Sequence, residues 1–213
     1  MSSPSNRAYL TEDYWKWTKS RRSDEQVARE IGYVRDAVGE GLPGKRVAVL
    51  GLGVGQHAIG LSHAGFEVTA LDYSQFGVSE AYHAGVKEGA SIRWEVVDAA
   101  SGSLPLFEAD AVVCVDWLAG GTEAWHRRLL RNVRSRLAPD GALVVLHSGE
   151  TLRDDQEVAD DGGYLLKQNY DPVTGRSFER VEVGGTEKAI EFSRRVYSTV
   201  ELVALVRSAG FLV

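Results

Sequence analysis

A short glycine-rich turn between a predicted strand and a predicted helix constrains this chain most. Residues 45–50 have the sequence KRVAVL, which is typical of a buried strand, and residues 51–55 have the sequence GLGVG. Residues from about 56 to 64 have the pattern of a helix, and Gly65 suits the position after its end. Glycines at such a junction let the backbone turn tightly and let a ligand approach closely. The turn therefore predicts a ligand-binding loop between a strand and a helix.

The same alternation of strand and helix continues along the chain. Apolar runs predict further strands at 67–71, 92–97, 111–115 and 142–146. Helices are predicted from Ser23, from 74 to 89 and from 122 to 137, with a turn at 139–141 before the fifth strand. Strands joined by helical crossovers imply a parallel sheet that is covered on both faces. The expected fold class is α/β: a doubly wound, mostly parallel sheet with helices on both faces and a small cap insertion after strand five.

The C-terminal third has a different character. Residues 148–178 are polar and predict irregular structure, although 164–180 is positioned to cover a substrate and its turn formers at 169–172 and 174–175 would allow a hairpin instead. Residues 179–183 and 188–196 predict a hairpin across Gly184-Gly185. Ser198 and Glu201 form a capping-box pattern before a last helix, and 211–213 resemble the start of a strand that is cut short. We expect one domain over 1–213, with an N-terminal lid and helix at 1–40 and a cap at 148–187.

Charge and cysteine content argue against binding of extended nucleic acid, an internal disulfide and a cysteine-rich metal site. The 213 residues carry 30 acidic and 24 basic side chains, a formal net charge of −6, which disfavours extended nucleic acid as a ligand. Cys114 is the one cysteine, so neither an internal disulfide nor a cysteine-rich metal site is expected, and no metal is predicted. Because no apolar segment is long enough to span a membrane, we expect a cytoplasmic protein. We also expect a monomer or homodimer with a small-molecule partner.

Two aspartates follow predicted strands at the same edge of the sheet as the glycine turn. Asp72 ends the second strand, where a carboxylate can accept hydrogen bonds from both ribose hydroxyls of a nucleoside. Asp98 ends the third strand and could accept a hydrogen bond from the exocyclic amine of adenine. Each aspartate could instead cap the following helix. The turn has the spacing G-x-G-x-G, and Gln56 stands where a dinucleotide fingerprint needs its third glycine.

These motifs together resemble those of class I S-adenosylmethionine (SAM)-dependent methyltransferases, which have a Rossmann-like fold. VAVLGLGVGQHAIGLSHAGFEVTALDYS resembles their glycine-rich first motif and acidic second motif. IRWEVVDA is similar to their third motif, and LAPDGALVVL to the turn before their fifth strand. The resemblance covers about residues 45–147, nearly half of the chain, and residues 195–211 have a pattern that also occurs in small-molecule members. It implies that the chain transfers a methyl group from SAM to an oxygen or nitrogen atom of a small molecule.

The resemblance also implies a set of cofactor-binding residues. Glycines of the turn would line the methionine part of SAM, Asp72 would hold the ribose, and Tyr73 would lie against the adenine. Val49 stands where the family usually has an acidic residue, so Asp116 or an N-terminal side chain would have to hold the SAM ammonium group. The complete expected set is Gly51, Gly53, Gly55, Asp72, Tyr73, Asp98, Ala99, Val115 and Asp116.

Candidate catalytic and acceptor-binding residues come from segments beside this edge. His147 follows strand five and is the candidate general base for a hydroxyl acceptor, although it could equally be a structural histidine. Either Arg194 or its neighbour Arg195, but not both, would face the pocket and meet an acceptor carboxylate. Trp94 and Trp125 are expected in the core. The expected substrate-binding residues are Tyr14, Trp15, Trp117, Tyr170 and Arg194.

Other functions remain open at this level. An NAD(P)-dependent oxidoreductase would use a related fold, with Gln56 counting against it, and a noncatalytic nucleotide-binding domain would be compatible with Val49. A nucleic-acid methyltransferase is disfavoured by the acidic charge.

Overall fold

The central element is a five-stranded parallel sheet with the order β3-β2-β1-β4-β5. The computed structural model describes residues 11–19, 21–39, 44–98, 104–105, 108–149, 153–159 and 163–213. The strands are β1 (Arg46–Leu50), β2 (Glu67–Asp72), β3 (Ile92–Val96), β4 (Ala109–Val115) and β5 (Leu137–Leu146). All of their recorded pairings are parallel. This confirms the expected α/β class.

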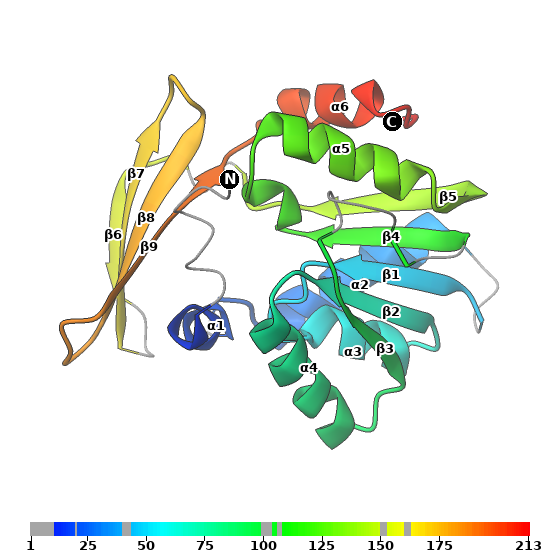
Figure 1. The fold of residues 1–213 in the computed structure, drawn as a ribbon, viewed down its shortest axis with the longest axis horizontal. Helices are drawn as coiled ribbons and strands as arrows, with labels where there is room; N and C mark the ends of the chain where they lie inside the picture. Colours follow the sequence, from blue (N-terminus) through cyan, green and yellow to red (C-terminus); the bar gives the residue numbers. More distant parts are fainter. Residues whose placement is uncertain are drawn as a thin grey trace.

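Helices cover both faces of this sheet (Figure 1). The first layer is α2 (Asp24–Val38), α3 (Gln56–His63) and α4 (Gln75–Lys87), whose apolar side chains share a core with Val47, Val49 and Val113. The second is α5 (Glu123–Arg134) and α6 (Thr199–Ser208), which pack on Ala48, Leu50 and Cys114. Alternate side chains of one strand thus enter opposite cores, as a doubly covered sheet requires.

The helices begin where polar caps predict. Ser23, Ser74, Thr122 and Ser198 each accept a hydrogen bond from a backbone N–H of the first helical turn. Such caps stabilise helix starts by about 1 kcal/mol each. Only at Ser198 is the full capping box recorded within the described residues, with Glu201 bonding back to the cap backbone.

The fifth strand begins earlier than the sequence predicts. The expected helix to Leu137 ends at Arg134, and Leu137 instead pairs with Ala109 at the start of β5. The expected turn at 139–141 is an irregularity inside β5, where the register shifts between Ala109 and Ala111. Gly141 fits here because a Cβ atom would lie 2.8 Å from the Ala109 carbonyl oxygen.

A second, antiparallel sheet forms the cap, with the order β6-β7-β8-β9. Its strands are β6 (Gln156–Ala159), β7 (Tyr164–Asp171), β8 (Arg176–Val183) and β9 (Ala189–Arg195). The predicted hairpin across Gly184-Gly185 is confirmed as β8–β9. The expectation of irregular structure over 148–178 is wrong for β6, for β7 and for the start of β8, and the alternative of a hairpin within 164–180 is confirmed as β7–β8.

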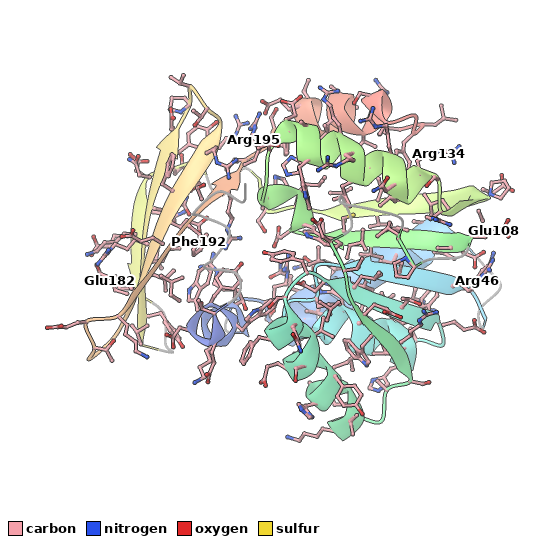
Figure 2. The ribbon with its side chains drawn as sticks, viewed as in Figure 1. Arg46, Glu108, Arg134, Glu182, Phe192 and Arg195 are labelled. Carbon is pink, nitrogen blue, oxygen red and sulfur yellow. The ribbon has the colours of Figure 1, made fainter. Side chains whose placement is uncertain are left out.

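A short helix, α1 (Glu12–Lys19), lies between the cap sheet and the parallel sheet (Figure 1). Trp17 contacts Phe192 of β9 with ring centroids 5.4 Å apart. On the other side, the Trp15 ring lies so close to Gly77 of α4 that a Cβ atom there would be 2.4 Å from it. Phe192 points into the space between the cap and α1, and Glu182 points away from it (Figure 2). Thus α1 packs between the cap sheet and α4 of the parallel-sheet layer.

None of the helices within these described ranges has both the length and the apolar character needed to cross a lipid bilayer.

Candidate functional site

A cavity of about 370 Å³ lies at the carboxyl ends of the parallel strands. Its floor is formed by the ends of β1, β2, β3 and β4, where the strand order reverses between β1 and β4. Ligands of open α/β sheets bind at this kind of switch point, and the volume is ordinary for a small-molecule site. Its lining includes eleven of the residues predicted from the sequence: Tyr14, Trp15, Gly51, Gly53, Asp72, Tyr73, Asp98, Val115, Asp116, Trp117 and Arg194.

The three glycines of the turn have different environments. Gly51 has φ +84°, and a Cβ atom there would lie 2.3 Å from the Val115 carbonyl oxygen. Gly53 has φ +52° with open space around the position of a Cβ atom. Gly55 is not part of the described cavity lining, since it packs against Ala81 of α4. Gly51 and Gly55 thus allow close packing of the backbone, and Gly53 leaves room at the cavity.

The Asp72 carboxylate is buried and fixed by the backbone. One oxygen accepts a hydrogen bond from the Leu52 N–H at 3.0 Å, and the other accepts one from the Ser74 N–H at 2.9 Å. The first bond ties the end of β2 to the glycine turn. Burial raises the pKa of Asp72 to about 6, although these backbone donors favour the charged form. A carboxylate of this kind still has lone pairs for a ligand that enters the cavity.

Asp98 follows β3 and lies on the rim of the cavity as an exposed side chain. Tyr73 is half-buried beside Asp72 and lines the same end. Ala99, the expected neighbour of Asp98, lies outside the described residues. The end of the cavity near β2 and β3 therefore combines an aromatic ring with two carboxylates.

Asp116 is held in a left-handed backbone conformation just after β4. Its φ of +48° is the only positive value among non-glycine residues in the described part of the chain. The carboxylate pairs with Arg22 at 2.8 Å, and it accepts hydrogen bonds from the N–H and the hydroxyl of Ser148, both at 3.2 Å. Burial opposes ionisation, but the charges of Arg22 and Arg194 lower the pKa of Asp116 below its usual value. Strained backbone of this kind concentrates at functional sites.

Aromatic side chains form much of the remaining wall. Trp117, in the short 3-10 helix η2 (Trp117–Ala119), is buried and lies next to Trp125 with ring centroids 6.2 Å apart. Trp125 also lines the cavity, which corrects the expectation that it is a core residue only. Its half-buried ring reaches the cavity because α5 starts directly beside η2.

Arg194 and Arg195 point in different directions, as strand alternation predicts. Arg194 lines the cavity, whereas Arg195 pairs with Glu201 at 2.8 Å and lies over the Tyr197 ring. Tyr170 is not among the lining residues, and Arg153 lies over its ring.

His147 is not among the described residues that line the cavity either. Its Nε2 atom accepts a hydrogen bond from the Tyr197 backbone N–H at 3.2 Å. Burial lowers the pKa of His147, and the nearby Asp116 carboxylate partly opposes this effect. The Nε2 atom, which would accept a proton from a substrate, is thus already hydrogen-bonded, because the His147 ring lies against the segment before α6.

The cavity also includes polar residues that the sequence reasoning did not select. Arg22 and Gln26 come from the segment before α2 and its first turn, and His57 comes from the start of α3. The buried Glu30 joins them: it bonds His57 at 2.6 Å and Gln26 at 3.0 Å. The sequence features that could have pointed to these residues are the adjacent Arg21 and Arg22 and the acidic Glu30 on a mostly apolar helix face. Neither feature indicates which residues come together in the folded chain.

Comparison with known proteins identifies a methyltransferase domain within part of the chain. Residues 47–141 match the model of a methyltransferase domain. No curated protein is similar enough in sequence to match the chain.

Several solved structures share the fold over most of both chains. A SAM-dependent methyltransferase from Clostridium acetobutylicum superposes with a TM-score of 0.72 at 16% identity, covering 96% of this chain and 87% of that one. A SAM-bound amino pentose methyltransferase from Micromonospora echinaspora gives 0.67 at 22% identity, covering 94% and 89%. A methyltransferase from Streptomyces caelestis gives 0.68 at 19% identity, covering 89% and 81%.

The matched domain includes the glycine turn, both strand-end aspartates and Asp116, and it forms the floor of the cavity. Residues 47–141 thus match a methyltransferase domain, and the fold of the chain is shared with SAM-dependent methyltransferases of known structure.

Proposed function

We propose that this chain is a SAM-dependent methyltransferase that methylates an oxygen or nitrogen atom of a small molecule bound between the parallel sheet and the cap sheet. The observation that carries this proposal is the extent of the cavity. It runs from the strand-end carboxylates and the glycine turn to Trp117, Trp125 and Arg194. Methyltransferases of the same fold include one that acts on an amino pentose and a glycopeptide N-methyltransferase.

The cofactor would occupy the end of the cavity at β1, β2 and β3. In this proposal Asp72 accepts hydrogen bonds from the ribose hydroxyls, Tyr73 lies against the adenine, and Asp98 bonds the adenine edge. Gly53 allows the close approach of the methionine part. Gln26 and Asp116 lie where its polar end would enter, and Asp116 supplies the negative charge that Val49 does not. Val49 is fully buried in β1, within the apolar core.

SAM supplies a sulfonium methyl group that a nucleophile attacks in line. The protein's part is then to align the acceptor and to exclude water. Trp117 and Trp125 provide an apolar wall beside Asp116, where a reacting amine or hydroxyl can be oriented. Because the Asp116 carboxylate lines the cavity and His147 does not, we assign to Asp116 the hydrogen bond from the reacting hydroxyl or amine.

Calorimetry with SAM and with its demethylated product tests the cofactor site. We expect both to bind, and Asp72→Asn to weaken both. Transfer of radiolabelled methyl from SAM to a metabolite extract tests the acceptor class. Label in the fraction that passes an ultrafiltration membrane supports the proposal. Absence of binding, or label only in retained protein or nucleic acid, contradicts it.

A further inference from the structure

The acceptor end of the cavity has a one-sided charge. The lining residues contributed by the N-terminal segment and the cap include three arginines, namely Arg21, Arg22 and Arg194, and no carboxylate among the described residues. The lining carboxylates belong to the strand ends, and Asp116 already pairs with Arg22. A ligand group that enters from the cap side therefore meets positive charge.

Arg194 is the most buried of these cations. It is 9% exposed, and its guanidinium carbon lies 5.1 Å from the centre of the Phe192 ring and 5.6 Å from that of Trp17. Its Nε atom is 3.0 Å from a carboxylate oxygen of Glu179. A guanidinium held between rings and a carboxylate loses little freedom on binding a further group, and its planar fork matches the geometry of a carboxylate or a phosphate.

Glu179 is placed to support Arg194 and not to bind the ligand. Its side chain is fully buried on β8 and is not part of the described cavity lining. Burial raises the pKa of Glu179, and the Arg194 charge opposes this effect. Among the described residues, the carboxylates that line the cavity are Asp72, Asp98 and Asp116 from the parallel sheet, so a cationic group entering from the cap side meets none that the cap or the N-terminal segment contributes.

Trp117 adds a hydrogen-bond donor at the same end. Its indole N–H is buried and has no hydrogen-bond partner among the described residues. Indole nitrogen only donates, so a ligand that satisfies it must bring an acceptor atom. Tyr14 and Trp125 supply aromatic surface beside it.

We propose that the acceptor carries an oxyanion group, a carboxylate or a phosphate, and that Arg194 binds this group with help from Arg21. Glu179 is the positioning residue behind Arg194. This inference rests on the proposed function, because it assumes that the acceptor occupies the cap end of the cavity. It narrows the acceptor from any small molecule to an anionic one.

The test uses the full chain saturated with the demethylated cofactor product, so that only the acceptor end is free. Benzoate, phenyl phosphate, benzyl alcohol and benzylammonium are titrated in turn by calorimetry. We expect at least one of the two anions to bind about tenfold more tightly than the neutral and cationic probes, and the tighter anion indicates which group the acceptor carries.

Substitutions test whether Arg194 causes the anion preference. Arg194→Gln should remove most of the anion preference, and Arg194→Lys should keep part of it, because lysine retains the charge without the planar fork. Arg180→Gln is the matched control, since Arg180 lies on the outer face of the same sheet and pairs with Glu182 and Glu191. It should bind the anions as the unaltered protein does. Glu179→Gln should lower anion affinity less than Arg194→Gln does.

Equal binding of all four probes, or equal losses in Arg194→Gln and Arg180→Gln, would overturn the inference. So would tight binding of benzylammonium that Glu179→Gln abolishes. Failure of the demethylated product to bind the unaltered chain would instead contradict the proposed function itself. Binding of that product to each variant also confirms that the variant is folded.

Discussion

Asp72 connects the glycine turn to the second strand while it lines the cavity. Its charged form is the better acceptor for ribose hydroxyls, but burial raises its pKa to about 6. A modest fall in pH therefore protonates the ligand-free protein at this residue. Asp116, in contrast, keeps its charge to lower pH because Arg22 and Arg194 lower its pKa.

We expect the affinity for SAM to be constant above about pH 7 and to fall as pH drops through about 6, by at most about tenfold per pH unit for one proton. Asp72→Asn should weaken binding roughly 10- to 100-fold at neutral pH and remove this pH dependence, because hydrogen bonds to a charged group contribute about 1.5–3 kcal/mol. Calorimetry across pH measures both effects. Asp110→Asn, at the opposite end of the sheet, is the control and should leave the curve unchanged. A flat curve for the unaltered protein would refute the assignment.

Two glycines of the turn should respond differently to the same substitution. Gly51→Ala places a Cβ atom against the Val115 carbonyl at a left-handed φ, so we expect a loss of about 2–5 kcal/mol of stability. Gly53→Ala meets open space and should cost only about 1–2 kcal/mol, mostly from its φ, while it weakens SAM binding. Urea unfolding and calorimetry separate the two effects. Similar stability losses in both variants would contradict the packing described here.

Elements of the parallel sheet are predictable from the sequence, whereas those around the acceptor are not. Strands β1 and β4 are largely apolar runs, and Ser and Thr caps mark the helix starts, so local sequence contains much of the necessary information. The β7–β8 hairpin is predictable only from its turn residues, as an alternative to a substrate cover, because the cap-inward face of β7 includes the polar Gln168, which hides the alternation of apolar and polar residues. Helix α1 has only eight residues, too few to be stable without its tertiary contacts.

The residues of the cavity likewise divide into those that the sequence predicts and those that it does not. Asp72, Asp98 and Gly53 follow from motif spacing along the chain. Arg22 and Gln26 reach the cavity because α2 packs against α3, the helix after the glycine turn, which no local pattern indicates. The cofactor-binding and catalytic roles of individual residues, and the single-domain boundaries, stay predictions.

Helix α1 should depend on Trp15 for its position. Trp15→Ala removes the ring that packs on Gly77, so we expect α1 to detach while the parallel sheet stays folded. Limited trypsin digestion should then cut faster at Lys16 and Arg21, and affinity for SAM should fall. Tyr33→Ala, at an exposed position on α2, should do neither. Unchanged digestion of Trp15→Ala would show that α1 is held by other contacts.

At the scale of the whole molecule, Cys114 reports on global unfolding. It is the one cysteine, fully buried in β4 at the centre of the sheet, and burial raises its pKa to about 12. A thiol reagent should therefore react only when the domain unfolds. The demethylated cofactor product at 100 times its dissociation constant should slow labelling about 100-fold, which corresponds to about 2.7 kcal/mol. Fast labelling that ignores the ligand would show that β4 opens locally.

The left-handed conformation of Asp116 has a consequence for anyone who evolves this enzyme in the laboratory. Glycine or asparagine at this position would relax the backbone, so a library screened for heat resistance alone would favour such replacements. Those survivors would lack the carboxylate at the bend and would turn over poorly. At position 116 we therefore expect replacements that raise thermal stability to lower the rate of methyl transfer.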